Sequence, residues 1–153
     1  MKIKNAKKFT RKGQLLNQVG ALPYRRGDGH SIEFLLLTSR GTQRFVIPKG
    51  WQMKGKSDRQ AVALEAKQEA GVTGQVKPTP VGAFQYWKRV KNAFVPIQVT
   101  VYALEVEAEL SNWKERGQRQ RRWLTSQQAA SLVDEPELSS LIASFQPSDQ
   151  TAG

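Results

Sequence analysis

The sequence contains no cysteine, and its 153 residues include a single histidine, His30. Without cysteine the chain forms neither disulfide bonds nor thiolate metal sites, and it carries no trace of a redox compartment. A lone histidine with no serine or cysteine partner gives no basis for a catalytic triad, so His30 receives no role. These absences argue against thiol and triad chemistry.

Long apolar runs are also missing. None approaches the roughly 20 residues that a helix needs to cross a bilayer. Hydrophobic and charged residues, at 39% and 24%, are typical of a globular protein. The basic segment Met1 to Lys12 is not followed by the apolar core of a secretory signal. We therefore expect one domain, no membrane association and, by default, a cytoplasmic location.

Acidic residues are scarce, because 13 Asp+Glu face 24 Lys+Arg for a formal net charge of +11. Such an excess attracts polyanions. We expect a flexible basic arm over residues 1–13, a single folded domain over 14–146 and a disordered tail over 147–153. The arm is interpreted as a solvated charge run, with nucleic-acid binding as the alternative.

Hydrophobic periodicity and turn residues predict strands separated by one central helix. The expected strands lie around residues 18–24, 32–39, 44–48, 81–90, 96–108 and 121–125. The pair 81–90 and 96–108 is interpreted as a hairpin. This arrangement indicates an α/β or α+β sandwich.

Helix ends are marked by capping residues. Ser57 is predicted to cap a helix from Asp58 to about Ala70, with Gly71 as its terminator. A second helix is expected at Ser126 to Leu132. A third is expected after Asp134 and Pro136, over residues 137–145.

The first predicted helix carries its acidic side chains on one face. Residues three and four apart share a helix face, so Glu65, Gln68 and Glu69 lie together. Ala61 and Val72 complete that stripe, and a second, close-packing stripe is formed by Ala63, Ala66 and Ala70. Two carboxylates and one amide, next to the backbone carbonyl of Gly50, are hard oxygen ligands of the kind that Mg²⁺ or Mn²⁺ prefers.

The stretch from Gly50 to Val72, GWQMKGKSDRQAVALEAKQEAGV, resembles the signature box of the Nudix hydrolase family. Family residues occupy the box positions Gly50, Glu65, Glu69, Gly71 and Val72. The resemblance implies an α/β/α sandwich with a mixed β-sheet between helices. It also implies a metal-dependent pyrophosphohydrolase that acts on acid anhydrides.

In such an enzyme Glu65 and Glu69 would be the catalytic pair, and Gly50, Glu65, Gln68 and Glu69 would hold the metal. Hydrolysis of a phosphoanhydride requires neutralised phosphate charge and an activated water in line, and bound Mg²⁺ or Mn²⁺ would supply both.

Three positions depart from the family box. Lys56, Leu64 and Gln68 stand where the family has Glu, Arg and Glu. The amide oxygen of Gln68 can coordinate a cation but brings no charge, so we expect weaker metal binding. Loss of both partners at Lys56 and Leu64 leaves no unpaired charge from that ion pair. Lys56 is then free to face a phosphate, as are Lys49 and Lys54.

The second half of the chain resembles the diphosphoinositol-polyphosphate and dinucleoside-polyphosphate branch of the family. The matching residues are Trp113, Glu115, Arg119, Arg121 and Trp123, with Ser39, Arg40 and Arg44 upstream. Guanidinium and ammonium groups pair well with phosphate oxygens. The predicted substrate-binding residues are Arg40, Arg44, Lys49, Lys88, Arg89 and Arg119. Among the aromatic residues Trp51, Tyr86, Trp87 and Trp123, either nucleobase stacking or a place in the core fits the pattern.

These patterns leave three hypotheses. The first is a metal-dependent hydrolase of a nucleoside-diphosphate-linked, dinucleoside-polyphosphate or diphosphoinositol-type substrate. The second is a catalytically impaired module that binds a phosphorylated metabolite, motivated by Lys56, Leu64 and Gln68. The third is nucleic-acid processing or binding through the basic arm.

Overall fold

A mixed β-sheet forms the middle of the protein. The computed structural model describes residues 16–39 and 44–147. The strands are β1 (Leu16–Arg26), β2 (Ile32–Thr38), β3 (Phe45–Val46), β4 (Lys49–Trp51), β5 (Val72–Val76), β6 (Gly82–Val90), β7 (Ala93–Glu109) and β8 (Arg121–Thr125). The helices are α2 (Asp58–Glu65), its π-helical continuation η3 (Ala66–Ala70), α3 (Ser126–Leu132) and α4 (Pro136–Ser144), with a 3-10 turn η2 (Asp28–His30).

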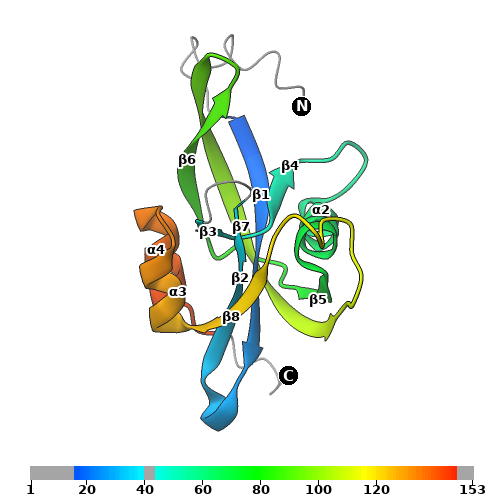
Figure 1. Cartoon of the computed structure of the whole chain (residues 1–153), viewed down its shortest axis with the longest axis vertical. Helices are drawn as coiled ribbons and strands as arrows, with labels where there is room; N and C mark the ends of the chain where they lie inside the picture. The colour runs from blue at the N-terminus through cyan, green and yellow to red at the C-terminus, as the bar shows by residue number, and fades with distance from the viewer. Residues whose placement is uncertain (1–15, 40–43, 148–153) are drawn as a thin grey trace.

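The long strands β1 and β7 run parallel at the centre of the sheet. Their register extends from Leu16 opposite Ile97 to Tyr24 opposite Glu105. The other strand pairs are antiparallel, and the order is β3-β2-β1-β7-β5, with β4 on β1, β6 on β7 and β8 on β2. Helices α3 and α4 cover one face of the sheet and α2 covers the other (Figure 1). The predicted sandwich with a mixed sheet between helices is confirmed.

Each face of the sheet has its own apolar cluster. Phe34 and Leu36 of β2 belong to the cluster beneath α3 and α4, whereas Leu35 and Leu37 belong to the cluster beneath α2. The continuous apolar run of β2 therefore serves both faces, as expected for a strand that is covered on two sides. Within the described ranges, no helix has the length and apolar character to span a bilayer.

The ends of helix α2 follow the predicted caps. The Ser57 hydroxyl accepts a hydrogen bond from the backbone N–H of Gln60, and the side-chain oxygen of Gln60 accepts one from the backbone N–H of Ser57. At the other end Gly71 adopts φ 67°, a left-handed conformation that suits glycine. The last turn, Ala66–Ala70, is π-helical, which the periodicity did not predict.

Other details correct the sequence-based expectations. Strands β4 and β5 were not predicted as separate elements, because both are short and depend on pairing with β1 and β7. The residue before α4 is Glu135, while Asp134 forms an ion pair with Arg44 at 3.1 Å. The expected domain boundaries stay predictions, and residues 1–15 and 148–153 lie outside the described ranges.

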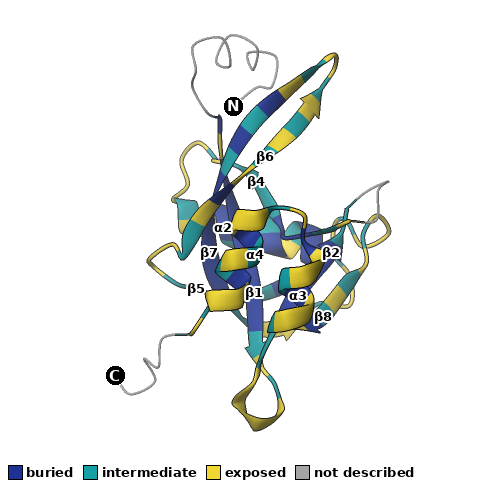
Figure 2. Ribbon diagram, turned by 90° about the vertical axis from the view of Figure 1, so that its left-hand side faces the viewer, coloured by how far each residue is buried: buried dark blue, intermediate teal, exposed yellow. Residues whose placement is uncertain are grey.

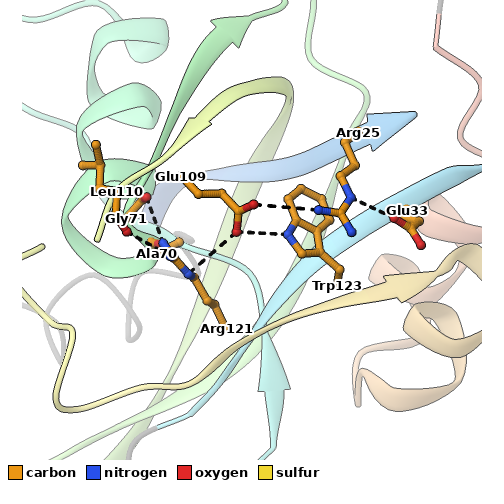
Figure 3. A network of polar contacts seen from close by, with 8 residues as sticks. All are labelled: Arg25, Glu33, Ala70, Gly71, Glu109, Leu110, Arg121 and Trp123. Atoms are coloured by element: carbon orange, nitrogen blue, oxygen red, sulfur yellow. Dashed lines mark hydrogen bonds and ion pairs between the residues drawn. The ribbon is translucent and has the colours of Figure 1, made fainter. Parts of the chain in front are cut away.

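Arg121 binds the C-terminal end of the α2–η3 helix to the rest of the protein (Figure 3). Its guanidinium donates hydrogen bonds to the carbonyls of Ala70 at 3.1 Å, Gly71 at 3.0 Å and Leu110 at 2.9 Å. It also lies 4.1 Å from the ring centroid of Trp113. One side chain thus satisfies carbonyls that the helix end leaves without intrahelical partners.

We expect Arg121→Leu to lower the free energy of unfolding by roughly 2–3 kcal/mol, because carbonyls at the helix end lose a charged donor. Urea denaturation followed by circular dichroism measures this change. Arg122→Leu is the matched control, since Arg122 is an exposed neighbour on the same strand. Equal stability of the two variants would contradict the fastening role.

Candidate functional site

A cavity of about 590 Å³ is lined by residues of α2, η3, β4 and β6. It brings together most of the residues predicted from the sequence. These are Arg44, Lys49, Gly50, Glu65, Glu69, Lys88, Arg89 and Arg119. Residues far apart in the chain therefore meet at one site.

Glu65 and Glu69 lie side by side in this cavity and share a hydrogen bond. Both come from the C-terminal half of the helix, next to strand β4. Gly50 makes this approach possible, because a Cβ atom at this position would overlap the Glu65 carboxylate. Glu69 is only 9% exposed, and it accepts a hydrogen bond from the backbone N–H of Lys49 at 3.3 Å.

Burial next to a second carboxylate changes the titration of both acids. The pKa of Glu69 is raised to about 8, first by burial and then by its hydrogen bond with Glu65 and the charge of Glu65. The positive charges of Arg119 and Lys49 oppose this rise. Burial also raises the pKa of Glu65. The pair thus holds a proton that a cation could replace.

Positive charge surrounds the carboxylate pair. Lys49 is held over the ring of Tyr86, with 5.0 Å from Nζ to the centroid, and burial lowers its pKa. Arg119 is held by an ion pair with Glu115 at 3.0 Å and donates to the carbonyl of Thr38 at 3.4 Å. Fixed cations of this kind suit phosphate groups, because little side-chain freedom is lost when the ligand binds.

The rim cations are less constrained. Arg44 forms its ion pair with Asp134 between side chains that are 51% and 57% exposed, so water weakens the pair. Arg89 is exposed and Lys88 is half-buried on β6. Arg40 lies outside the described residues, so its predicted role stays a prediction.

Gln18 is a site residue that sequence reasoning missed. It is 5% exposed, and its side-chain oxygen accepts a hydrogen bond from the Tyr86 hydroxyl at 2.7 Å. Its position in the otherwise apolar run of β1 was the available signal, because a buried amide requires a partner. Tyr86, Trp51 and Trp87 line the cavity, whereas Trp123 packs beside the cluster under α2.

Several predicted contributors lie elsewhere. Gln68 is half-buried and is not among the described residues lining the cavity, and its carbonyl accepts a hydrogen bond from the backbone N–H of Glu115 at 3.0 Å. The π-helical turn changes the i, i+3 and i+4 spacing on which its placement was based. Lys54 and Lys56 are exposed in the loop before α2, also away from the cavity lining. The assignment of Gln68 as a metal ligand stays a prediction.

The branch residues Trp113, Arg121 and Trp123 have a structural explanation. Trp113 and Arg121 stack on one another at the helix end. Trp123 donates a hydrogen bond from Nε1 to Glu109 at 3.2 Å (Figure 3). Together they support the helix that carries the carboxylates. Of the residues that match the branch pattern, Ser39, Arg44 and Arg119 line the cavity.

The donor set fits a hard divalent cation. Within the described part of the chain, no group of three or more His, Cys, Asp or Glu side chains converges. Glu65 and Glu69 are therefore the carboxylates that could bind a metal ion at this site. Mg²⁺ sites often contain one or two carboxylates, with water and substrate phosphates as the other ligands. A carboxylate pair below a cation-lined cavity matches that pattern.

Known proteins resemble the chain in sequence and fold, although no family model matches it. Nudix hydrolase 13, mitochondrial, of Arabidopsis thaliana is 30% identical over 145 residues, which span 82% of this chain and 71% of that protein. The crystal structure of a C. elegans Ap4A hydrolase binary complex has a TM-score of 0.62 and 22% identity, covering 84% of this chain and 93% of that one.

The Nudix domain of Shewanella oneidensis NrtR, complexed with ADP ribose, has a TM-score of 0.61 and 12% identity, covering 94% of this chain and 97% of that domain. At these identities the two solved structures show a shared fold. The likeness to Nudix hydrolase 13 extends over most of both sequences. On that basis the chain belongs to the Nudix hydrolase family.

Proposed function

We propose that this protein hydrolyses a phosphoanhydride bond in a nucleoside-diphosphate-linked, dinucleoside-polyphosphate or diphosphoinositol-type substrate, with Mg²⁺ or Mn²⁺ as cofactor. The observation that carries the proposal is the pair Glu65 and Glu69, placed side by side in a cavity lined by five cationic side chains. This combination matches a polyphosphate chain and the cation that accompanies it.

The cations bind and orient the phosphate chain. Lys49 and Arg119 lie near the carboxylates, as their effect on the pKa of Glu69 indicates, while Arg44, Lys88 and Arg89 come from the rim. Contacts from the inner cations and from the rim cations would together align the bridging oxygen of the phosphoanhydride above Glu65 and Glu69. Alignment of the reacting atoms is a large part of catalysis in phosphoryl transfer.

The carboxylates hold the cation and move the proton. When bound, the divalent ion would neutralise phosphate charge and lower the pKa of a water molecule. Glu65, the more accessible acid, is the residue we assign to accept the proton of the attacking water. The new P–O bond forms as the bridging P–O bond breaks, and the leaving phosphate takes the electron pair. Glu69, at the buried end of the cavity, would remain a ligand of the divalent ion.

The relatives support a nucleotide-like substrate. One structural neighbour is an Ap4A hydrolase, and another binds ADP ribose. Ap4A and ADP ribose both contain phosphoanhydride bonds attached to adenosine. The half-buried Trp51 and the exposed Trp87 at this cavity are available to stack on a base. A cytoplasmic location stays part of the proposal.

Glu69→Gln should abolish metal-stimulated hydrolysis while leaving the fold intact. The neutral amide resembles the protonated acid that is present at neutral pH when the pKa is about 8. Release of nucleotides, sugar phosphate or inorganic phosphate from diadenosine tetraphosphate, nucleotide sugars and diphosphoinositol phosphates respectively, measured with Mg²⁺ and with Mn²⁺, tests this expectation. Glu107→Gln, at an exposed position on β7, is the control. Turnover by Glu69→Gln at the rate of the unmodified protein would refute the assignment.

Metal-free protein should lose stability as the pH rises toward 8. The folded chain keeps a proton on Glu69 between its ordinary pKa of 4.5 and about 8, whereas the unfolded chain has released it. The stabilisation is complete below pH 4.5 and disappears as the pH passes about 8. Thermal unfolding in a chelating buffer across this range measures the effect.

The decrease in thermal stability with rising pH should be smaller in Glu69→Gln, which cannot titrate at that position. Added Mg²⁺ should restore stability at high pH, because the cation replaces the proton. Parallel pH profiles for the unmodified protein and the variant would show that Glu69 titrates normally.

A binding module is the second candidate. The absence of a third convergent acid within the described residues, together with Gln68 in place of the family Glu, favours it. Such a module would hold a phosphorylated metabolite or RNA in the same cavity without turnover. The two functions share a ligand class and differ in the strength of the metal site.

Gln68→Glu separates the two candidates. If the protein is an enzyme, the unmodified chain already turns over, and the variant needs less metal for half-maximal activity because of the added charge. If it is a binding module, hydrolysis is absent at the start and appears in the variant. Gln75→Glu, which adds the same charge at an exposed position on β5, is the control.

A further inference from the structure

The β6–β7 hairpin exposes two aromatic side chains to solvent. Trp87 is 66% exposed and Phe94 is 61% exposed. Among the described residues, the other large hydrophobic residue with comparable exposure is Leu132, at 42% on α3. Exposed aromatic residues that cluster on one element mark an interaction surface.

The two rings lie on the same face of the hairpin. Trp87 is opposite Pro96, and Arg89 is opposite Phe94. Because side chains alternate along a strand, these residues share one face, and Trp87 and Phe94 are diagonal neighbours roughly 7–8 Å apart. Val95 and Ile97 point to the other face, where they are buried. The hairpin carries this exposed face beyond the body of the sheet (Figure 2).

Positive charge is interleaved with the rings. Arg89 lies between them in the register, and Lys91 follows at the turn with φ 50°. No acidic residue occurs over residues 82–98. Aromatic rings that accept stacked bases, next to cations that accept phosphates, are the combination by which single-stranded nucleic acid is bound without sequence readout.

The positions of the rings argue against insertion into a membrane. The hairpin turn consists of the polar Lys91 and Asn92, whereas the rings lie on a strand face beside Arg89. Burial of both rings in lipid would also bury the guanidinium of Arg89, which is costly. A nucleic-acid strand, in contrast, uses rings and cations together.

This face is continuous with the carboxylate cavity, because Trp87 and Arg89 line both. We propose that the hairpin face formed by Trp87, Arg89 and Phe94 binds single-stranded nucleic acid and leads its 5′ end toward Glu65 and Glu69. The 5′ end is where a nucleic acid carries phosphoanhydrides. The orientation, though not the binding, rests on the proposed function.

Binding of an RNA of about ten nucleotides, with a 5′-triphosphate and a 3′ fluorophore, tests the proposal by fluorescence anisotropy in a chelating buffer. Phe94→Ala should weaken binding roughly five- to hundredfold, the loss expected for one stacked base. Trp87→Ala should weaken it similarly. Leu132→Ala, which removes an exposed apolar side chain on another element, should bind as the unmodified protein does.

Hydrolysis provides the second readout. Phe94 does not line the cavity, so Phe94→Ala should hydrolyse diadenosine tetraphosphate at the unmodified rate with Mg²⁺ and the triphosphorylated RNA more slowly at subsaturating concentration. If the unmodified protein hydrolyses nothing, the proposed function and the orientation fail, while the anisotropy result still decides the binding surface.

Three results would overturn the binding surface. The first is unchanged RNA affinity in both hairpin variants. The second is equal affinity for the same RNA as a duplex, which would indicate charge attraction without stacking. The third is ring-dependent binding to vesicles of anionic lipid with no ring-dependent RNA binding, which would assign the hairpin to a membrane surface.

Discussion

Two carboxylates held together at the inner end of a cavity are the constraint on which the rest of this structure depends. Their mutual repulsion and burial favour a shared proton or a bound cation over two free charges. The surroundings keep them together nonetheless. Small residues let the helix pack closely on the sheet, Gly50 leaves room for Glu65, and Arg121 holds the helix end from behind. Both carboxylates can be ionised together only when added positive charge, such as a bound cation, offsets their repulsion.

The sequence predicted those features that depend on neighbouring residues. Ser57 and Gly71 act through hydrogen bonds and backbone angles within a few positions, so their roles could be inferred without a structure. The hairpin and helix α3 were predicted for the same reason. The alternation of side chains along β6 and β7 is a local pattern. The apolar run of β2 indicated a strand that is covered on both faces.

Features that depend on distant partners could not be predicted in this way. Strand β4 exists because residues 49–51 meet β1, and the π-helical turn at Ala66–Ala70 is not encoded by apolar spacing. Regular helical spacing therefore placed Gln68 beside Glu65 and Glu69. From the sequence, Arg121 was identified only as a residue that matches the diphosphoinositol-polyphosphate and dinucleoside-polyphosphate branch. Its actual partners are three backbone carbonyls that only the folded chain brings near it.

The two faces of the β6–β7 hairpin differ in how well they tolerate amino-acid substitution. The inward side chains of the hairpin, such as Val95 and Ile97, belong to the apolar cluster beneath α3 and α4, whereas Trp87 and Phe94 belong to neither cluster. Substitution of these outward side chains leaves both cores intact. Position 94, which lies outside both clusters and outside the cavity lining, can therefore vary without loss of the packing that supports Glu65 and Glu69.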